Sequence, residues 1–380
     1  MSTICLEIIR ADNLIPKGLS WWPGCQIETV SAFHVSSGPT VTASWGTFWT
    51  TPPPEVRAFW IKVIGCSSTI LTMPLGTQVL LLEFGANSMG EIRNLTRLFL
   101  PTTAVVTQVA SVHLAGFGSI EGVLRAKMEI TESPVLRNFV YGADNSLLRK
   151  AAAELSPNIR RFGVGREYGD YRIGKTVFTL EGNSPALSFQ LKSPDGEECF
   201  RAVVWGMKLA EPVAFGAVVG NVLGLSLDVC AERLASFASL KGRGRVISLP
   251  GPERRFIVDD AYNANPVSMR SSLETFVALD SVGRKVAVLG DMRELGENEN
   301  RYHEELIPLL EKVDRIVFVG EIWRTSLSSR NGWDFVSRWQ EAVALLEEAP
   351  WNALLVKGSN SHRLGELVES FAGAKETDAR

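Results

Sequence analysis

The distribution of apolar residues divides the chain into regions of different period. Between residues 78 and 130, apolar strands such as 78–82 and 104–109 alternate with helices, the first opening at Gly90. Apolar residues recur along that helix at Ile92, Leu95, Leu98 and Phe99. From about Asp170 the period shortens to two, with turns between the segments, which predicts antiparallel strands added to the sheet.

After residue 284 apolar strands and helices alternate three times, ending with the strand LLVKGS and a last helix. This alternation predicts a Rossmann-like domain. The apolar run 212–227 contains Asn221 and is shorter than the roughly 20 residues that cross a bilayer, so we interpret it as a buried helix. Together the patterns predict an α/β fold with a central parallel sheet, added antiparallel strands and a C-terminal Rossmann-like domain.

Composition and charge narrow the classes of function. The 380 residues suffice for two or three domains, and the net charge of -3 gives no electrostatic reason to expect nucleic acid or an anionic membrane as partner. The five cysteines form no CxxC pair, which indicates neither zinc nor a disulfide framework and fits a reducing cytoplasm. Because Glu7, Arg10 and Asp12 interrupt the first apolar residues, we expect no signal peptide.

Polar residues are concentrated in the segment Val258–Met269, which reads VDDAYNANPVSM. Asp259 and Asp260 end an apolar strand, and Asn265 followed by Pro266 is typical of a helix N-cap and first helical position. One face of the expected helix carries Met269, Leu273, Phe276 and Val277. Backbone N–H groups at a helix start attract anions, so the corner suits a nucleotide, although a well-capped loop explains DDxxN alone equally well.

The order of the motifs resembles the Mur ligases. DDAYNANPVSM is followed by GDMRELG (290–296), by His303 and by VKGS (356–359), and is preceded by EFGAN (83–87), HLAGFGS (113–119) and AKMEI (126–130). The resemblance spans residues 31 to 370. It implies a cytoplasmic, ATP-dependent amide ligase that adds D-alanyl-D-alanine to UDP-N-acetylmuramoyl-tripeptide through an acyl phosphate, in peptidoglycan synthesis.

The resemblance also implies a division into domains. Residues 31–240 would form the central ATP-binding domain, 241–283 a connection with the GR and DDAYNANP motifs, and 284–380 the C-terminal ligase domain. Residues 1–30 are assigned to no domain. Too little chain precedes the central domain for the family's uridine-binding domain, so we expect weak binding of UDP-N-acetylmuramoyl-tripeptide. We also expect a monomer.

The family's phosphate-binding loop, which ends in GKTT, corresponds to His34–Trp45. Ser37, Gly38 and Thr40 are the nucleotide contacts that the resemblance implies, but Pro39 occupies the position of the lysine. Such loops use consecutive backbone N–H groups and the lysine to hold the phosphates. Pro39 removes a positive charge and an N–H group, so we expect little ATP hydrolysis.

Three residues are expected at a Mg²⁺ site. In Mur ligases the residue matching Lys127 is carbamylated, which turns it into a carboxylate ligand, and Glu83 and His113 match the other metal ligands. We expect His113 and Lys127 to be catalytic as well. Neighbouring parallel strands would bring Glu83 and His113 to the carboxyl edge of one sheet. Spacing alone leaves open that they are ordinary solvated side chains.

The other expected contacts lie in the C-terminal half. The resemblance implies that nucleotide is bound by Arg243, Asp260, Asn263 and Asn265. It further implies that phosphate or the incoming dipeptide is faced by Asp291, Lys357 and Ser359, with His303 in a catalytic role. Lys208 and Pro212 replace a histidine and an asparagine of the family, and that asparagine helps to line its adenine pocket, which weakens nucleotide binding.

Two other interpretations stay open. The departures from the family lie in the N-terminal part and at the adenine pocket, which favours a catalytically silent relative that keeps the fold as an interaction surface. Half of the 10 tryptophans lie in the first sixth of the chain together with Pro52, Pro53 and Pro54. This composition differs from the rest and is compatible with a damaged or misread gene.

Overall fold

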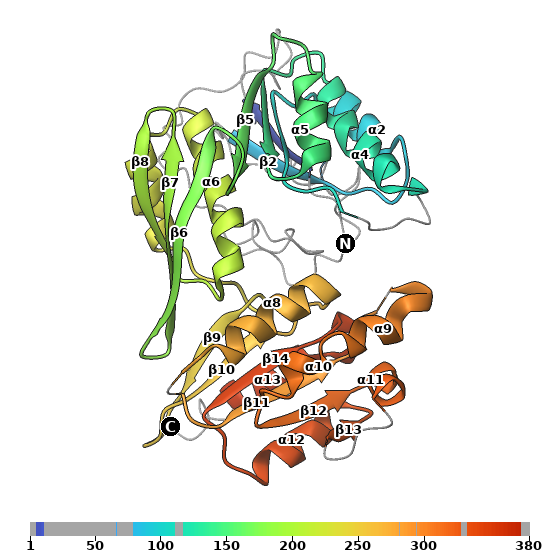
Figure 1. The fold of residues 1–380 in the computed structure, drawn as a ribbon, viewed down its shortest axis with the longest axis vertical. Helices are drawn as coiled ribbons and strands as arrows, with labels where there is room; N and C mark the ends of the chain where they lie inside the picture. Colours follow the sequence, from blue (N-terminus) through green and yellow to red (C-terminus); the bar gives the residue numbers. More distant parts are fainter. Residues whose placement is uncertain are drawn as a thin grey trace, which may run out of the picture. The chain divides into compact units, whose positions relative to one another are not determined.

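A computed structural model describes residues 5–10, 66, 79–110, 117–280, 282–293, 295–327 and 333–373. The chain divides into two compact units, which we call the first and the second unit (Figure 1). The first comprises Met1–Thr176, Phe189–Phe200 and Ala210–Ala235. The second comprises Val177–Ser188, Arg201–Leu209 and Ser236–Arg380. His113 and the phosphate-loop positions Ser37, Gly38, Pro39 and Thr40 lie outside the described residues.

The first sheet has eight strands in the order β2-β1-β3-β4-β5-β6-β7-β8. Their bounds are β1 Cys5–Arg10, β2 Val79–Phe84, β3 Thr103–Val106, β4 Asn138–Gly142, β5 Arg160–Gly165, β6 Tyr171–Glu181, β7 Ser184–Ser193 and β8 Gly196–Ala202. β3, β4 and β5 pair in parallel, whereas β1 runs antiparallel between β2 and β3. The expectation that the strands leading to Glu83 and His113 are neighbours is therefore wrong, because β1 separates β2 from β3.

Helices cover both faces of the parallel strands. They are α2 Glu91–Phe99, α4 Ile120–Met128, η4 Glu129–Glu132, α5 Ser146–Ala153, α6 Ala210–Val222 and α7 Leu227–Ala235. Figure 1 shows α2, α4 and α5 together on one side, where they share a core with Ala104 and Val106. α6 packs on β4 and β5 and is buried over most of its length, which confirms the interpretation of this apolar run.

The helical stripe of α2 was predicted with one error. Ile92, Leu95 and Phe99 are buried, but Leu98 is 59% exposed. At about 100° per residue, Leu98 lies about 110° from the middle of the buried stripe. Thr96 belongs to the buried stripe instead.

The region of period two forms hairpins as predicted. Residues 182–183 connect β6 to β7 and residues 194–195 connect β7 to β8. Connections of two residues are typical of antiparallel pairs. Gly182 has a φ of 61°, in the region where glycine is favoured for tight turns.

The second sheet has six strands in the order β13-β12-β11-β14-β10-β9. Their bounds are β9 Arg245–Leu249, β10 Arg255–Asp260, β11 Lys285–Gly290, β12 Arg315–Val319, β13 Asp334–Val336 and β14 Ala353–Lys357. All pairs are parallel except β9 with β10. The accompanying helices are η5 Met207–Leu209, α8 Pro266–Val277, η6 Gly296–Asn298, α9 Glu299–Glu304, α10 Ile307–Leu310, α11 Glu321–Ser326, α12 Trp339–Glu347, η7 Asn360–His362 and α13 Leu364–Ala372.

Alternate residues of the second sheet face two separate cores. Phe256, Val258, Leu289 and Phe318 join the core that contains the residues of α8, and Ile257, Val288 and Val317 join the core that contains those of α12 and α13. Covering both faces explains the continuous apolar strands and gives the Rossmann-like arrangement predicted from the sequence.

Two details of the second unit differ from the expected alternation. The helix expected through His303 and Leu310 is divided into α9 and α10, and Pro308, which lacks an N–H group, lies in the first turn of α10. β13 is an additional strand at the edge of the sheet.

The expected boundary at residue 284 lies just before β11, whereas β10 and α8 belong to the same sheet and core as β11 to β14.

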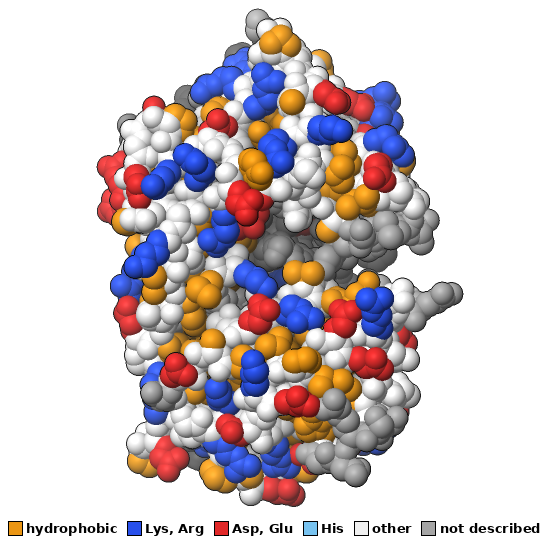
Figure 2. Space-filling model, viewed as in Figure 1, with side chains coloured by type: hydrophobic (Ala, Val, Ile, Leu, Met, Phe, Trp, Pro, Cys, Tyr) orange, Lys and Arg blue, Asp and Glu red, His pale blue; other side chains and the backbone are white. Residues whose placement is uncertain are grey.

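The surface charges are mixed, and the described helices are short. Figure 2 shows Lys and Arg side chains interspersed with Asp and Glu over the visible face of the described residues. In the part of the chain that the structure describes, no helix combines the length and apolar character needed to cross a membrane.

Candidate functional site

Two predicted metal-site residues lie at the same edge of the first sheet. Glu83 is the penultimate residue of β2, and its carboxylate oxygens are shielded from solvent. Lys127 on α4 is 6% exposed, and its Nζ donates a hydrogen bond to the carbonyl oxygen of Gln108, just beyond β3. β2 and β3 both run antiparallel to β1, so their carboxyl ends meet at one edge.

The chemistry of these two residues fits Mg²⁺ under one condition. Mg²⁺ prefers oxygen ligands, which the carboxylate of Glu83 provides. Lys127 offers an oxygen only when its amine carries a carbamate, as the resemblance implied. Within the described residues, which exclude His113, no three His, Cys, Asp or Glu side chains form a metal-binding group. A site would therefore need the carbamate of Lys127 as well as the carboxylate of Glu83.

The loop before Lys127 is fixed by its own sequence. Ser119 caps α4 by accepting a hydrogen bond from the backbone N–H of Gly122. A Cβ at Gly122 would lie 1.9 Å from the carbonyl oxygen of Phe117, so only glycine permits this close approach. The sequence GFGSIEG therefore sets where α4 begins and how Lys127 is presented.

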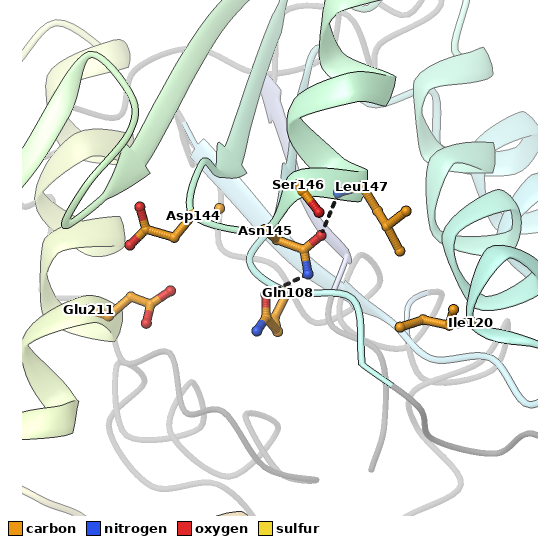
Figure 3. A pocket seen from close by; sticks show the side chains of 8 residues that line it. Gln108, Ile120, Asp144, Asn145, Ser146, Leu147 and Glu211 are labelled. Carbon is orange, nitrogen blue, oxygen red and sulfur yellow. Dashed lines mark hydrogen bonds between the residues drawn. The ribbon is translucent and has the colours of Figure 1, made fainter.

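A cavity of about 380 Å³ opens beside the carboxyl end of β4 (Figure 3). Its lining comes from the end of β3, the start of α4, the β4–α5 connection and the start of α6: Gln108, Ile120, Gly142, Asp144, Asn145, Ser146, Leu147 and Glu211. Asn145 is its central fixed group. Its Oδ1 accepts hydrogen bonds from the N–H groups of Leu147 and Leu148, and its Nδ2 donates to Gln108 Oε1 at 3.0 Å and Val109 O at 2.8 Å.

The two carboxylates of the cavity have different surroundings. Burial raises the pKa of Asp144, but hydrogen bonds from the N–H groups of Arg166, Tyr168 and Glu167 outweigh this and lower the pKa overall. Glu211 is exposed as a residue, yet burial around its carboxyl group raises the pKa, and the charge of Asp144 raises it further. Carboxylates repel phosphate, so the cavity favours uncharged groups that donate hydrogen bonds.

These cavity residues were not predicted. The signal was present, because YGADNS places polar residues between the apolar strand β4 and a helix start, as DDAYNAN does after β10. Glu211 had no such signal, since it stands alone before an apolar helix.

At the edge of the second sheet the structure brings three predicted residues together. Asp260 on β10 and Lys357 on β14 are direct partners in the register of adjacent strands. Lys357 is 2% exposed, and its Nζ lies 2.8 Å from Asp260 Oδ2 and donates to the carbonyl oxygen of Asn263 at 3.0 Å. An ammonium group has three N–H groups, so one remains for a substrate oxygen.

The predicted start of α8 is confirmed. Asn265 is the N-cap, and it forms a capping box in which its Oδ1 accepts from the N–H of Ser268 at 2.9 Å. Asn265 is buried, and its Nδ2 has no hydrogen-bond partner among the described residues. A buried donor without a partner is costly, so this group suits an acceptor oxygen of a ligand.

Arg243 is held by its neighbours in the GRGR segment. Its guanidinium lies 3.9 Å from the centre of the Tyr262 ring, a cation–π arrangement. Next to it, buried Asp259 accepts from the N–H of Gly242 at 2.8 Å and from Arg245 at 3.2 Å. Burial raises the pKa of Asp259, and these two donors offset part of that effect.

Asp291, for which a substrate-binding role was expected, is fully buried, and that role stays a prediction. Asp291 is 0% exposed, its Oδ1 accepts from the N–H of Trp323 at 3.0 Å, and its Oδ2 lies 3.5 Å from His362 Nε2. Burial raises the pKa of Asp291, but His362 and the Trp323 N–H lower it below the ordinary value. Its carboxylate therefore connects the end of β11 to the start of α11 and to η7.

His303 is also buried, and the catalytic role expected for it stays a prediction. The residue is 0% exposed. Its Nε2 accepts from the N–H of Met292 at 3.0 Å, and its Nδ1 lies 2.7 Å from the carbonyl oxygen of Glu299, to which it donates. Burial lowers the pKa, so the ring is a neutral positioning group that supports the GDM segment.

Ser359 connects the KGS and GDM segments. Its Oγ accepts from the N–H of Arg293 at 3.0 Å, and its own N–H donates to the carbonyl oxygen of Asp291 at 3.1 Å. The hydroxyl hydrogen remains available to a substrate, so a binding role for Ser359 stays a prediction.

Comparison with known proteins agrees with this arrangement of two units. The profile of the Mur ligase middle domain matches residues 40–204, and that of the Mur ligase glutamate ligase domain matches residues 242–360. The chain belongs to the Mur ligase family.

Within this family, the chain is similar to ligases that add D-alanyl-D-alanine. The chain is 30% identical to the UDP-N-acetylmuramoyl-tripeptide--D-alanyl-D-alanine ligase of Bacillus subtilis, with 81% of this chain and 67% of that protein covered. It is 29% identical to the same ligase of Escherichia coli, with 81% and 68% covered. A crystal structure of the MurF ligase of Thermotoga maritima with ADP matches with a TM-score of 0.69 and 27% identity, covering 82% of this chain and 71% of that one.

Proposed function

We propose that this chain is an ATP-dependent amide ligase that joins D-alanyl-D-alanine to UDP-N-acetylmuramoyl-tripeptide in peptidoglycan synthesis. The observation that carries the proposal is the match to ligases of this name over 81% of the chain, which includes both sheet edges described above. The proposal takes the chain to act as a monomer in the cytoplasm, where ATP is available.

The reaction has two steps. A carboxylate oxygen of the tripeptide attacks the γ-phosphorus of ATP, and the bond to ADP breaks, which gives an acyl phosphate. The amine of D-alanyl-D-alanine then attacks the acyl carbon, the bond to phosphate breaks and the amine loses a proton. Charge accumulates around the phosphates in the first step, so catalysis depends on cations and fixed donors.

The first unit supplies the nucleotide and metal contacts in this proposal. Glu83, His113 and the carbamate of Lys127 would hold Mg²⁺, which would neutralise phosphate charge when bound. The cavity beside β4 would take the uncharged end of the nucleotide, because carboxylates such as Glu211 accept hydrogen bonds from amino and hydroxyl groups. The phosphates would then lie toward Lys127.

The second unit supplies donors. We assign to Arg243 and to Asn265 Nδ2 the task of donating to phosphate or nucleotide oxygens. The remaining N–H of Lys357 and the hydroxyl of Ser359 would contact a carboxylate or carbonyl oxygen of the incoming dipeptide. Because Asp260 already balances the charge of Lys357, this lysine acts as an oriented donor more than as a free charge.

The test measures product formation in two forms of the protein. Pro39 lacks the cationic donor of the phosphate loop, and losing such a donor costs about a hundred- to a thousandfold in rate, so we expect slow turnover by the natural sequence. The double variant Pro39→Lys, Val41→Thr restores the GKTT ending and should raise both Mg²⁺-dependent ATP binding and turnover. Turnover is measured as ADP release that requires both D-alanyl-D-alanine and the nucleotide substrate, with mass spectrometry of the pentapeptide product.

Two outcomes would contradict parts of the proposal. Fast turnover by the natural sequence would contradict the placement of the phosphate loop at Pro39. Absence of ATP binding and product in both forms would contradict the ligase function and favour the catalytically silent relative.

A further inference from the structure

Glu129 is a buried carboxylate at the end of α4 that has no part in the proposed reaction. It is 1% exposed and is the first residue of η4. Its Oε1 and Oε2 accept hydrogen bonds from the N–H of Gly90 at 2.8 and 3.1 Å, and Oε2 accepts from the N–H of Arg93 at 2.9 Å. The guanidinium of Arg93 lies 3.4 Å from Oε1. Glu129 therefore binds the N-terminus of α2.

The position of this contact joins two parts of the proposed metal site. Glu129 lies two residues after Lys127 in the sequence. Gly90 is the last residue of the short loop that connects β2, which carries Glu83, to α2. That loop is closed at its other side by the N–H of Asn87, which donates to Glu91 Oε2 at 2.9 Å. The carboxylate of Glu129 therefore connects the segment that follows Glu83 to the end of the helix that carries Lys127.

The N-terminus of α2 has no cap from its own sequence, which explains why a residue distant in the sequence binds it. The N-cap of α2 is Gly90, with a φ of 87° and no side chain that could cap the helix. A local Ser or Asp would satisfy the free N–H groups of α2 without fixing the helix to anything else. Glu129 accepts from two of these N–H groups, those of Gly90 and Arg93, so the same hydrogen bonds also tie α2 to the end of α4.

We propose that Glu129 is a positioning residue that holds Glu83 and Lys127 in the arrangement needed to bind Mg²⁺. The proposal rests on the proposed function, because it concerns the metal site of that reaction. When residues that contact and orient metal ligands are replaced, the affinity for the metal falls by about 10- to 100-fold. An effect of that size on Mg²⁺ binding, beyond any effect on folding, distinguishes positioning from simple stabilisation.

Glu132 provides a matched control on the same short helix. It contacts Arg93 through two hydrogen bonds, at 2.6 and 2.7 Å, but its side chain is 43% exposed and no backbone N–H of α2 is bonded to it. Glu132→Gln removes a charge beside Arg93 and leaves the α2 N-terminus attached. Glu129→Gln keeps the size of the side chain but replaces one acceptor oxygen with an NH₂ group that opposes the N–H donors.

The experiment uses the full chain with the Pro39→Lys, Val41→Thr background and measures two quantities. Calorimetry gives the Mg²⁺ concentration at half-saturation of ATP binding, and ¹³C NMR with labelled bicarbonate gives the carbamate occupancy of Lys127. We expect Glu129→Gln to raise the half-saturating Mg²⁺ about 10-fold or more and to lower the carbamate signal. We expect Glu132→Gln to change neither by more than about twofold, as for an exposed ion pair.

The possible outcomes separate the two proposals. Glu129→Gln that is folded and binds Mg²⁺ like its parent would overturn the positioning role. If Glu129→Gln does not fold, Glu129→Asp replaces it, since it keeps the charge and shortens the reach, and unchanged Mg²⁺ binding there would also overturn the role. A parent protein with neither Mg²⁺-dependent ATP binding nor a carbamate signal would overturn the proposed function and this inference with it.

Discussion

The two sheet edges of this protein satisfy their charges in different ways. In the second unit the buried charges lie beside partners on the same sheet edge: Lys357 is paired with Asp260, and Asp291 lies beside His362 and accepts from the Trp323 N–H. In the first unit, Asp144 accepts from backbone N–H groups of a loop, Glu129 accepts from those at the N-terminus of α2, and Glu211 has a raised pKa beside a cavity. At the second edge the charged groups are held by protein partners, and the buried Asn265 Nδ2 is left as a donor, whereas the first edge is rich in acceptors.

The largest expected effect concerns the extent of the second unit. A fragment of residues 284–373 would lack β10, which pairs with β14, and the buried α8 residues Met269, Leu273 and Phe276. We expect no cooperative thermal transition from it by circular dichroism. A fragment of residues 236–373 contains β9, β10 and α8, so we expect a sigmoidal transition. Cooperative unfolding of the shorter fragment would contradict this and restore a boundary at 284.

The next largest effect is expected at the buried ion pair. Lys357→Met leaves the Asp260 carboxylate without its partner, and breaking a buried pair costs about 3–5 kcal/mol in the free energy of unfolding. Adding Asp260→Asn should recover part of this loss. Arg201→Met is the control, because its pair with Glu181 is more than half exposed on both sides and is worth less than about 1 kcal/mol. Urea unfolding gives the free energy of unfolding of the unmodified chain, the two single Met variants and the double variant. Equal losses of stability from Lys357→Met and Arg201→Met would contradict the difference between a buried and an exposed ion pair.

A smaller effect is expected from the titration of His303. Burial lowers its pKa in the folded state below the ordinary 6.5, so the unfolded state takes up a proton first as the pH falls. The stability that depends on neutral His303 is complete above pH 6.5 and is lost as the pH falls through the folded pKa. His303→Gln should cost about 1 kcal/mol at pH 8 and remove this pH dependence. Melting temperatures from pH 8 to pH 5 test it, and parallel curves would exclude His303 as the source.

The smallest effects are expected at the cavity, with opposite signs. Glu211 has a raised pKa in the folded state, so its contribution to stability falls as the pH rises through that pKa. Glu211→Gln should stabilise the protein by less than about 0.5 kcal/mol at pH 8 and not at pH 4. Asp144→Asn should destabilise it by about 0.5 kcal/mol at pH 8, because its pKa is lowered but solvent screens the charge of this exposed residue. The same sign for both variants in thermal unfolding would contradict this account.

Features set by neighbouring residues were predictable from the sequence. The N-cap at Asn265, the start of α8 at Pro266 and the alternation of strands and helices follow from local side-chain chemistry and periodicity. The meeting of Asp260 and Lys357 was predictable only as a common sheet edge. Their direct pairing depends on the order of the strands, which the pattern of apolar residues does not determine.

Burial and distant contacts were not predictable in the same way. The motifs GDM and His303 were expected at a surface facing substrate, but a motif gives the order of residues and not their exposure, and both Asp291 and His303 are fully buried. The contact of Glu129 with Gly90 joins a helix end to a helix start far apart in the chain. No local pattern around AKMEI indicates it.

The place of β14 in the second sheet has a consequence for how the protein is made. β14 lies between β10 and β11, but Ala353–Lys357 leaves the ribosome long after both of them. Until then β10 and β11 each present an unpaired edge to the surroundings, and such edges are sites of aggregation. The sheet therefore closes only after β14 has been made, by insertion of this strand between two that are already present. Ribosomes that stall before codon 353 would release chains open along the middle of the sheet, the form most in need of a chaperone.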